Sequence, residues 1–497
     1  MEPTVAVTGG RVSGRVVDGV SVFLGIPYAA APVGPARFAP PAPPTPWEGV
    51  RPAVEFGPTS LQSPYPPAIA EILGSDHIPG AEYLNVNVWT PDTGAQGLPV
   101  MVWIHGGAFT RGANSRAAYD GTAFARDGVV LVSVNYRLGV SGFAVLDGAP
   151  ANRGLLDQIY ALAWVRDNIA AFGGDPADVT LFGESAGGIS VAALLAAPAA
   201  RGLFAKAIVQ SGTARMAATL EDGRLLGAEL AATLNIPATA AAFAAVEPAD
   251  LLAAQETLIA AYMTNPDPAR WGASIVASGL GITCLFPVID GEVLTGDVLA
   301  AVAAGSATGV PLLLGYTAEE FRLFLVPTGI AALVTEEALP LMLTRYGLDP
   351  ALAHVYAADR PDAAPGDLLA AILTDHAFRA PTMELADTQS GTGAPVFVYE
   401  FAWRRTDRPL GAMHALEIPF VFDTLPASAP LTGPAAPQPL ADTVHAAWIA
   451  FAKSGNPGWT PYTPGTRPVM TFDHPTSHLT HAPRAKELTA LTESRTP

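Results

Sequence analysis

Val179-Thr180-Leu181-Phe182-Gly183-Glu184-Ser185-Ala186-Gly187 is the stretch that decides how this chain folds. The run Val179–Phe182 is β-branched and aromatic, as expected of a buried strand, and Ala186–Ala197 is rich in helix-forming residues up to Pro198. A strand that turns at once into a helix holds the serine of a G-x-S-x-G motif on a strained turn, with its hydroxyl raised above the sheet. Ser185 is therefore a candidate nucleophile. The alternative is a glycine-rich turn whose serine has no catalytic role.

Strand-like and helix-like runs alternate around this stretch. Compact β-branched or aromatic runs occur at Val86–Trp89, Pro99–Ile104 and Val129–Asn135. Gly154–Ala171 places apolar residues at the spacing of one helix face. Strands that alternate with helices predict an α/β fold, in which a large, mainly parallel central sheet is flanked by helices.

We expect one domain, residues 1–497, with two additions to the sheet. Short β-like runs in residues 1–50 predict an N-terminal antiparallel ribbon, followed by a proline-rich loop. Residues 218–270 are rich in alanine and predict a helical insertion, broken at Pro237, Pro248 and Pro266.

The composition excludes several classes of protein. The chain has 27 Lys and Arg against 45 Asp and Glu, a formal net charge of −18, and no basic run, which disfavours nucleic acid as a partner. Of its 497 residues, 50% are hydrophobic and 14% are charged, which excludes a disordered chain. Its single cysteine, Cys284, cannot form an internal disulfide.

Two uncharged stretches, Trp271–Ile289 and Val298–Ala318, have the length of a membrane span. Glycines and prolines interrupt both, so we expect helix ends, turns and buried strands there, and no membrane association. The N-terminus, Met1–Thr4, has neither a basic nor an apolar region typical of a signal peptide. A cytoplasmic location is the expectation.

A second glycine-rich turn, His105-Gly106-Gly107-Ala108-Phe109, follows the strand-like run that ends at Ile104. Two consecutive glycines after a buried strand can direct backbone N–H groups into a cavity, as an oxyanion hole requires. The alternative is an ordinary Gly-Gly turn. His105 itself is expected to be structural.

A serine nucleophile also needs a base and a carboxylate that orients it. Among nine histidines, His414 lies in a loop-like stretch after the strand Pro395–Phe401, whereas His445 lies on an apparent amphipathic helix. Glu319 and Glu320 both follow the buried run Leu312–Leu314, where an open α/β sheet places site residues. Spacing alone does not choose between these two acids.

Metal chemistry has little support in the sequence. His474, His478 and His481 have suggestive spacing, but no H-E-x-x-H motif or cysteine pair accompanies them. We expect no metal and no cofactor.

The motifs keep a recognisable order along nearly the whole chain. They are Phe23–Ala29, Arg37-Phe38, Asn87–Pro91, His105–Gly107, Asn135–Gly139, Gly154–Gln158, Phe172–Pro176, Gly183–Gly187, Gln210–Gly212, Pro287–Gly291, Glu320 and the loop around His414. Together they resemble the type-B carboxylesterases of the α/β-hydrolase fold, the cholinesterase and para-nitrobenzyl esterase group.

The resemblance implies a catalytic triad of Ser185, His414 and Glu320, because the family has an acid before its catalytic glutamate in this loop. It also implies an oxyanion hole and a supporting serine. The oxyanion residues would be Gly106, Gly107 and Ala186, and the supporting residue would be Ser211.

The sequence departs from the family pattern at several positions. Ser60 and Tyr83 stand where the family has two cysteines, and Ala81, next to Glu82, stands where it has the glutamate that pairs with the arginine equivalent to Arg137. Near the triad, Phe321 and Ala415 each replace a usual glycine. We expect these two changes to reshape an apolar pocket formed by Phe109, Phe321 and Phe324.

The expected function is hydrolysis of neutral short-chain aryl or alkyl esters through an acyl-enzyme. The partner would be a small-molecule ester, and a monomer is expected. The excess negative charge should disfavour anionic esters. Polyester fragments, carbamates and amides are alternative substrates for the same triad, an aggregated lipid is another, and a non-catalytic interaction protein of the same fold is the rival class.

Overall fold

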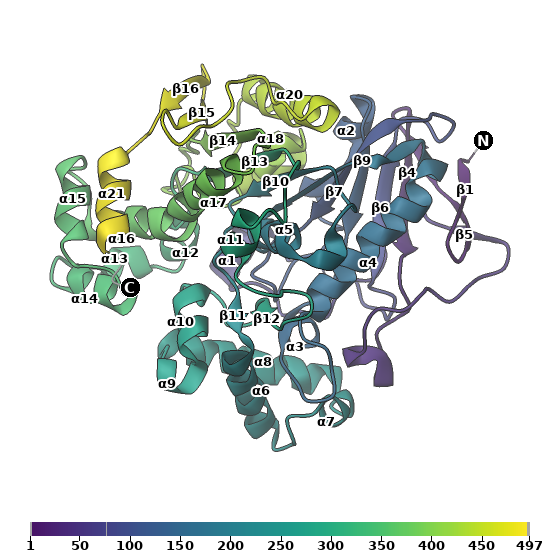
Figure 1. Ribbon diagram of the computed structural model, residues 1–497, viewed down its shortest axis with the longest axis horizontal. Coiled ribbons are helices and arrows are strands. Elements are labelled where there is room, and N and C mark those ends of the chain that lie inside the picture. Colours follow the sequence, from purple (N-terminus) through teal and green to yellow (C-terminus); the bar gives the residue numbers. More distant parts are fainter. Residues whose placement is uncertain (1, 76, 495–497) are drawn as a thin grey trace.

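The computed structural model describes residues 2–75 and 77–494 (Figure 1). Residues 1, 76 and 495–497 lie outside that description. The predicted domain 1–497 therefore begins and ends at residues outside this description. Met1, the first residue of the segment in which no signal peptide is expected, also lies outside it.

A large mixed sheet forms the centre of the molecule. Its strands are β3 (Arg15–Val17), β4 (Val20–Pro27), β6 (Asn85–Thr90), β7 (Leu98–Ile104), β8 (Val130–Val134), β9 (Gly174–Glu184), β10 (Lys206–Gln210), β13 (Leu312–Thr317), β14 (Val396–Phe401), β15 (Pro468–Phe472) and β16 (His478–His481). Within the described residues these eleven strands lie in the order β16-β15-β14-β13-β10-β9-β7-β8-β6-β4-β3. Neighbours from β15 through β8 pair in parallel, which confirms the predicted α/β class.

Both faces of this sheet are covered by helices, so successive strand residues enter different layers of the core. In β7, Val100 and Val102 pack in one apolar cluster, whereas Met101 and Trp103 pack in the other. The first layer is covered by α4 (Arg153–Asn168) and α5 (Ala186–Ala196), and the second by α2 (Thr122–Arg126) and α20 (Gln438–Ser454) (Figure 1).

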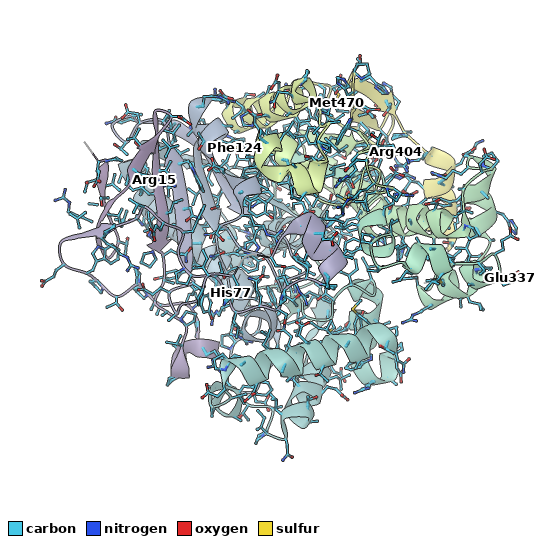
Figure 2. The ribbon with its side chains drawn as sticks, turned by 180° about the vertical axis from the view of Figure 1, so that it is seen from behind. Arg15, His77, Phe124, Glu337, Arg404 and Met470 are labelled. Carbon is cyan, nitrogen blue, oxygen red and sulfur yellow. The ribbon has the colours of Figure 1, made fainter. Side chains whose placement is uncertain are left out.

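The N-terminal strands divide between two sheets. β3 and β4 form an antiparallel hairpin that joins the large sheet beside β6. β1 (Thr4–Val7), β2 (Gly10–Ser13) and β5 (Val50–Pro52) form a small sheet of their own. The ribbon predicted for residues 1–50 is therefore partly an edge of the main sheet. Figure 2 shows Arg15 of β3 and Met470 of β15 toward opposite ends of that sheet.

The predicted helical segment 218–270 breaks where its prolines occur. It contains β11 (Ala218–Thr219), α6 (Leu220–Leu234), α7 (Ala240–Ala244), α8 (Pro248–Thr264) and the start of α9 (Pro268–Trp271). The two long uncharged stretches are also interrupted: α10 (Ala273–Gly279) and β12 (Val288–Ile289) lie in the first, and α11 (Val298–Ala303) and β13 in the second. Across residues 2–75 and 77–494, no helix is long and apolar enough to cross a membrane.

The described residues contain further helices outside the sheets. They include α1 (Pro67–Leu73), α3 (Gly139–Phe143), α12 (Arg322–Leu325), α13 (Ile330–Leu333), α14 (Ala338–Arg345), α15 (Leu352–Ala358), α16 (Pro365–Thr374), α17 (Ala380–Ser390), α18 (Ile418–Val421), α19 (Ala429–Thr432) and α21 (Ala485–Ser494). One turn of π-helix, η5 (Asp375–Arg379), joins α16 to α17. 3₁₀ turns lie at η1 (Gly34–Phe38), η2 (Ala117–Tyr119), η3 (Ile169–Phe172), η4 (Pro198–Ala200) and η6 (Leu425–Ser428).

A buried ion pair joins the loop after β8 to α4. Nε and Nη2 of Arg137 donate to the two carboxylate oxygens of Asp157 at 2.8 and 2.7 Å, and both side chains are fully buried. Nη1 of Arg137 donates to the Ala39 carbonyl at 2.6 Å. Glu82 pairs instead with Arg51 at 2.7 Å, near the surface. Arg137 is therefore paired with Asp157 and not with Glu82.

We predict that Asp157→Asn lowers the free energy of unfolding by about 3–5 kcal/mol, because it leaves the Arg137 charge buried without its partner. The control is Asp167→Asn on the same helix, whose pair with Arg166 is about half exposed and should contribute less than about 1 kcal/mol. Urea unfolding of both variants measures the difference. Equal stabilities for the two variants would contradict this account.

Candidate active site

The turn between β9 and α5 holds Ser185 in a strained conformation. Its backbone lies at φ 55° and ψ −122°, a region that residues with a side chain rarely adopt. The Ser185 N–H donates to the Gln210 carbonyl at 3.0 Å, which fixes the turn against β10. Glycine is required at Gly187, since a Cβ there would lie 2.0 Å from the carbonyl oxygen of Ile104. The strand, turn and helix predicted around the motif are therefore confirmed.

The glycine-rich turn after β7 approaches the same serine. A Cβ added at Gly106 would lie 3.0 Å from the Cβ of Ser185. Gly107 has φ 112°, a conformation that favours glycine. In the described part of the chain, no hydrogen bond occupies the N–H groups of Gly106 and Gly107. Both residues, together with Ala186 at the first position of α5, line one cavity with Ser185.

His414 and Glu320 are joined by a hydrogen bond of 2.5 Å between Nδ1 and Oε2. The other oxygen of Glu320 accepts hydrogen bonds from the Ser211 hydroxyl at 2.7 Å and from the Thr317 N–H at 2.8 Å. All four side chains are buried. The carboxylate is thus fixed by three donors, and it fixes the orientation of the imidazole in turn.

Glu319 faces away from the imidazole. Its Oε2 accepts a hydrogen bond from the Ala412 N–H at 2.9 Å, and its Oε1 pairs with Arg404 at 2.8 Å. The two neighbouring acids therefore have different surroundings, and the one that contacts His414 is Glu320.

A second carboxylate faces the opposite side of the ring. Nε2 of His414 lies 3.1 Å from Oε1 of Glu184, the residue before Ser185. Among residues 2–75 and 77–494, the Ser185 hydroxyl has no hydrogen-bond partner, although Ser185 and His414 line the same cavity. Catalytic hydrogen bonds of this kind are often long or misaligned without substrate and tighten when it binds.

Buried carboxylates control the ionisation of this imidazole. Burial lowers the pKa of His414, but the negative charges of Glu184 and Glu320 outweigh it and raise that pKa to about 9. Burial likewise raises the pKa of Glu184 to about 7 and that of Glu417 to about 8. Oε1 of Glu417 accepts a hydrogen bond from Gln210 at 3.1 Å. The site therefore stabilises the imidazolium form.

The cavity that contains Ser185 and His414 has a volume of about 610 Å³. The predicted pocket residues Phe109, Phe321 and Phe324 all line it. The rings of Phe324 and Phe378 lie 5.3 and 5.0 Å from the imidazole ring. Aromatic side chains thus enclose the imidazole and limit its access to water.

The two departures from the family near His414 have different consequences. Ala415 has φ 67°, the left-handed region in which glycine is unstrained and alanine is not. Phe321 places its ring 5.3 Å from that of Phe324 and 6.1 Å from that of Phe378, so it adds to the aromatic wall.

Two further histidines, His105 and His445, are buried in the core. Nδ1 of His105 lies 2.8 Å from the Gly106 carbonyl, its ring stacks on Tyr136, and burial lowers its pKa to about 4. Nδ1 of His445 lies 2.7 Å from the Val421 carbonyl inside the core.

The C-terminal histidines lie at the edge of the large sheet. His478 and His481 are the first and last residues of β16, and His474 precedes that strand. For the residues that the structure describes, no group of three His, Cys, Asp or Glu side chains is arranged to hold a metal ion.

Sequence reasoning did not single out three residues of the site. Glu184 was visible inside the quoted G-x-S-x-G stretch, and Glu417 lies three positions after His414. Phe378 had no local motif to mark it, because its position against the imidazole depends on the π-helical turn η5.

Known proteins are similar to this chain over most of its length. A family model described as the carboxylesterase family matches residues 1–491. The chain is 41% identical over 487 residues to the para-nitrobenzyl esterase of Bacillus subtilis, with 93% of each chain covered. It is 33% identical over 468 residues to the phenmedipham hydrolase of Pseudarthrobacter oxydans, with 92% of this chain and 90% of that protein covered.

Solved structures extend the similarity to the fold. A carboxylesterase of Geobacillus stearothermophilus superimposes with a TM-score of 0.85 at 35% identity, covering 98% of this chain and 99% of the other. A para-nitrobenzyl esterase gives a TM-score of 0.84 at 36% identity, with 99% of each chain covered. The chain therefore belongs to the carboxylesterase family, has the α/β-hydrolase fold, and is a carboxylic-ester hydrolase.

Proposed function

We propose that this protein hydrolyses neutral carboxylic esters through a triad of Ser185, His414 and Glu320. The observation that carries the proposal is the 2.5 Å contact between His414 and Glu320 at the cavity that also contains Ser185. The strained backbone of Ser185 supports its role as nucleophile, because such strain is maintained where a side chain must be presented.

The first step acylates the serine. His414 Nε2 moves from Glu184 to the Ser185 hydroxyl and accepts its proton as Oγ bonds to the ester carbonyl carbon. Glu320 holds the imidazole tautomer and stabilises the imidazolium. The tetrahedral intermediate collapses, the carbon–oxygen bond to the alcohol breaks, and His414 donates the proton to the departing alcohol oxygen.

The second step releases the acid. A water molecule gives its proton to His414 and bonds to the acyl carbon, and the bond to Ser185 Oγ then breaks as Oγ regains a proton. In both steps the N–H groups of Gly106, Gly107 and Ala186 stabilise the oxyanion, each by about 3 kcal/mol. These groups complete the reaction without a cofactor.

The pocket supports neutral substrates. Aromatic rings surround the imidazole, and the acids Glu184, Glu320 and Glu417 are buried beside it. An ester with its own negative charge would be repelled by the Glu320 carboxylate and by the chain's net charge of −18. A volume of about 610 Å³ accommodates aryl as well as short alkyl esters.

We predict that Ser185→Ala lowers kcat for 4-nitrophenyl acetate by on the order of 10⁶-fold, because the nucleophile is lost. Ser454→Ala, an exposed position on α20, is the matched control and should retain wild-type activity. Thermal melting checks that both variants fold. Wild-type rates in folded Ser185→Ala would place the nucleophile elsewhere.

Glu320→Gln should reduce kcat by about 10⁴-fold, because the amide cannot hold the same imidazole tautomer or stabilise its cation. Glu319→Gln removes the charge of the neighbouring residue, which does not contact His414. We expect kcat to fall less than tenfold, roughly the effect of losing a near-surface ion pair. Steady-state kinetics of the two variants compare them, and the reverse ranking would assign the acid to Glu319.

We predict that kcat/KM increases with pH, and that this ascending limb of the pH profile lies above pH 6.5. His414 acts as a base only when neutral, and its pKa is raised to about 9. Glu184→Gln removes a negative charge that favours the imidazolium, so the limb should move to lower pH. Glu221→Gln, on the exposed surface of α6, is the control. A pH profile of kcat/KM that stays in place or moves upward in Glu184→Gln would refute this assignment.

A further inference from the structure

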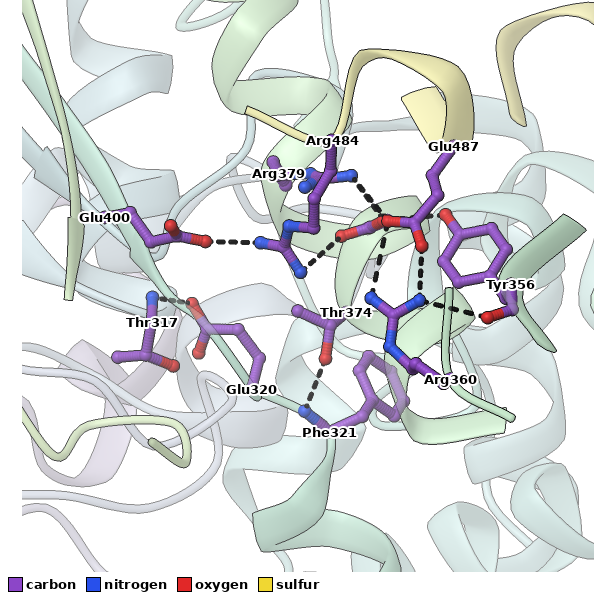
Figure 3. Close-up of polar contacts among 11 residues, drawn as sticks. Thr317, Glu320, Phe321, Tyr356, Arg360, Thr374, Arg379, Glu400, Arg484 and Glu487 are labelled. Atoms are coloured by element: carbon purple, nitrogen blue, oxygen red, sulfur yellow. Dashed lines mark hydrogen bonds and ion pairs between the residues drawn. The ribbon is translucent and has the colours of Figure 1, made fainter. Parts of the chain in front are cut away.

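The C-terminal helix α21 is anchored by a network of buried charged side chains (Figure 3). Glu487 on this helix is 1% exposed. Its carboxylate pairs with Arg360, and Nη2 of Arg379 lies 3.6 Å from its Oε2. Leu491, one turn further along, is also fully buried, so one face of α21 is held against the body of the protein.

A second set of ion pairs connects the segment before α21 to the central sheet. Arg484, just before α21, pairs with Glu400 on β14, and its Nη1 lies 3.8 Å from Oδ1 of Asp375. Oδ2 of Asp375 also accepts hydrogen bonds from the Tyr356 hydroxyl and from Arg379, each at 2.6 Å. We call this set the C-terminal ion network. Its acids are Asp375, Glu400 and Glu487, and its bases are Arg360, Arg379 and Arg484.

The network converges on the π-helical turn η5. Asp375 and Arg379 are the first and last residues of this turn, and both are fully buried on the side of α21. Ala377 and Phe378, between them, line the active-site cavity. A single π-helical turn inside a longer helix is uncommon and frequently marks a functional position. The turn thus has one face in the network and another in the substrate pocket.

The same turn contacts the residues around the triad. The Phe378 ring lies 5.0 Å from the His414 ring and 6.1 Å from the Phe321 ring. The residue before the turn, Thr374, accepts a hydrogen bond from the Phe321 N–H at 3.1 Å (Figure 3). Phe321 directly follows Glu320 in the chain, so a displacement of η5 would move the aromatic wall beside the triad.

We propose that α21 is a positioning element for specificity: Glu487, acting through Arg379, sets the position of Phe378 and thereby the width of the pocket beside His414. This inference rests on the proposed function. Glu487 does not line the cavity, so it acts only through other residues. Loss of its charge would leave Arg379 with one acid fewer in a buried site, which favours a shifted turn.

The test compares Glu487→Gln with the wild type in the full chain. The substrates are 4-nitrophenyl acetate, 4-nitrophenyl benzoate with a bulky acyl group, and 1-naphthyl acetate with a bulky alcohol. We expect the kcat/KM of at least one bulky ester, relative to 4-nitrophenyl acetate, to rise roughly threefold to tenfold, mainly through a lower KM. A role limited to stability would lower the active fraction for all three esters equally and leave these ratios unchanged.

Glu493→Gln is the matched control, because Glu493 lies on the exposed face of the same helix. If Glu487→Gln does not fold, Glu487→Asp takes its place, since it keeps the buried charge but its shorter side chain withdraws the carboxylate from Arg379 and leaves the pair of Arg379 with Asp375 intact. It should change the ratios in the same direction. Unchanged ratios in the variant that folds overturn the inference.

The variant Phe378→Ala tests whether the effect of Glu487 on specificity passes through Phe378. This variant should raise the same ratio directly, and adding Glu487→Gln, or Glu487→Asp in its place, to it should produce no further change. Additive changes would overturn the route through Phe378. If the wild type hydrolyses none of the three esters, the proposed function itself fails; if it hydrolyses them and the ratios never change, only the positioning role fails.

Discussion

The left-handed backbone of Ser185 is the constraint on which the rest of the structure depends. A residue other than glycine in such a conformation costs about 1–3 kcal/mol, so the surroundings must hold it. β9 and α5 are buried on either side, and the neighbouring β10 accepts the Ser185 N–H. Because the strands around β9 are parallel, their carboxyl ends bring the Gly106-Gly107 turn and Ser211 to the same edge of the sheet.

The charges around His414 have two opposite effects on its proposed role as a base. Glu320 is held by three donors, whereas Glu184 lies across the ring with few polar partners of its own. In the proposed mechanism, both acids stabilise the imidazolium that forms when Ser185 loses its proton. The same acids raise the pKa of His414, so the resting imidazole stays protonated to higher pH. The fraction of neutral imidazole that can accept a proton is therefore smaller.

Much of the fold could be predicted from the sequence because local patterns mark it: β7, β9, α4 and α5 follow hydrophobic runs and periodicity. The choice between Glu319 and Glu320 could not be made from spacing, since both follow β13 closely. It depends on Ser211 and on the position of His414, which come from distant segments. Asp375 and Arg379 resemble an ordinary surface pair at i and i+4, so only the packing of α21 places them in the core.

Covalent labelling tests the central claim most directly. Diethyl 4-nitrophenyl phosphate transfers its phosphoryl group to an activated serine and releases 4-nitrophenolate. We predict one equivalent of 4-nitrophenolate per chain, loss of esterase activity in parallel, and a diethylphosphoryl group located on Ser185 by peptide mass spectrometry. Stoichiometric inactivation with the label on any other residue would contradict the account.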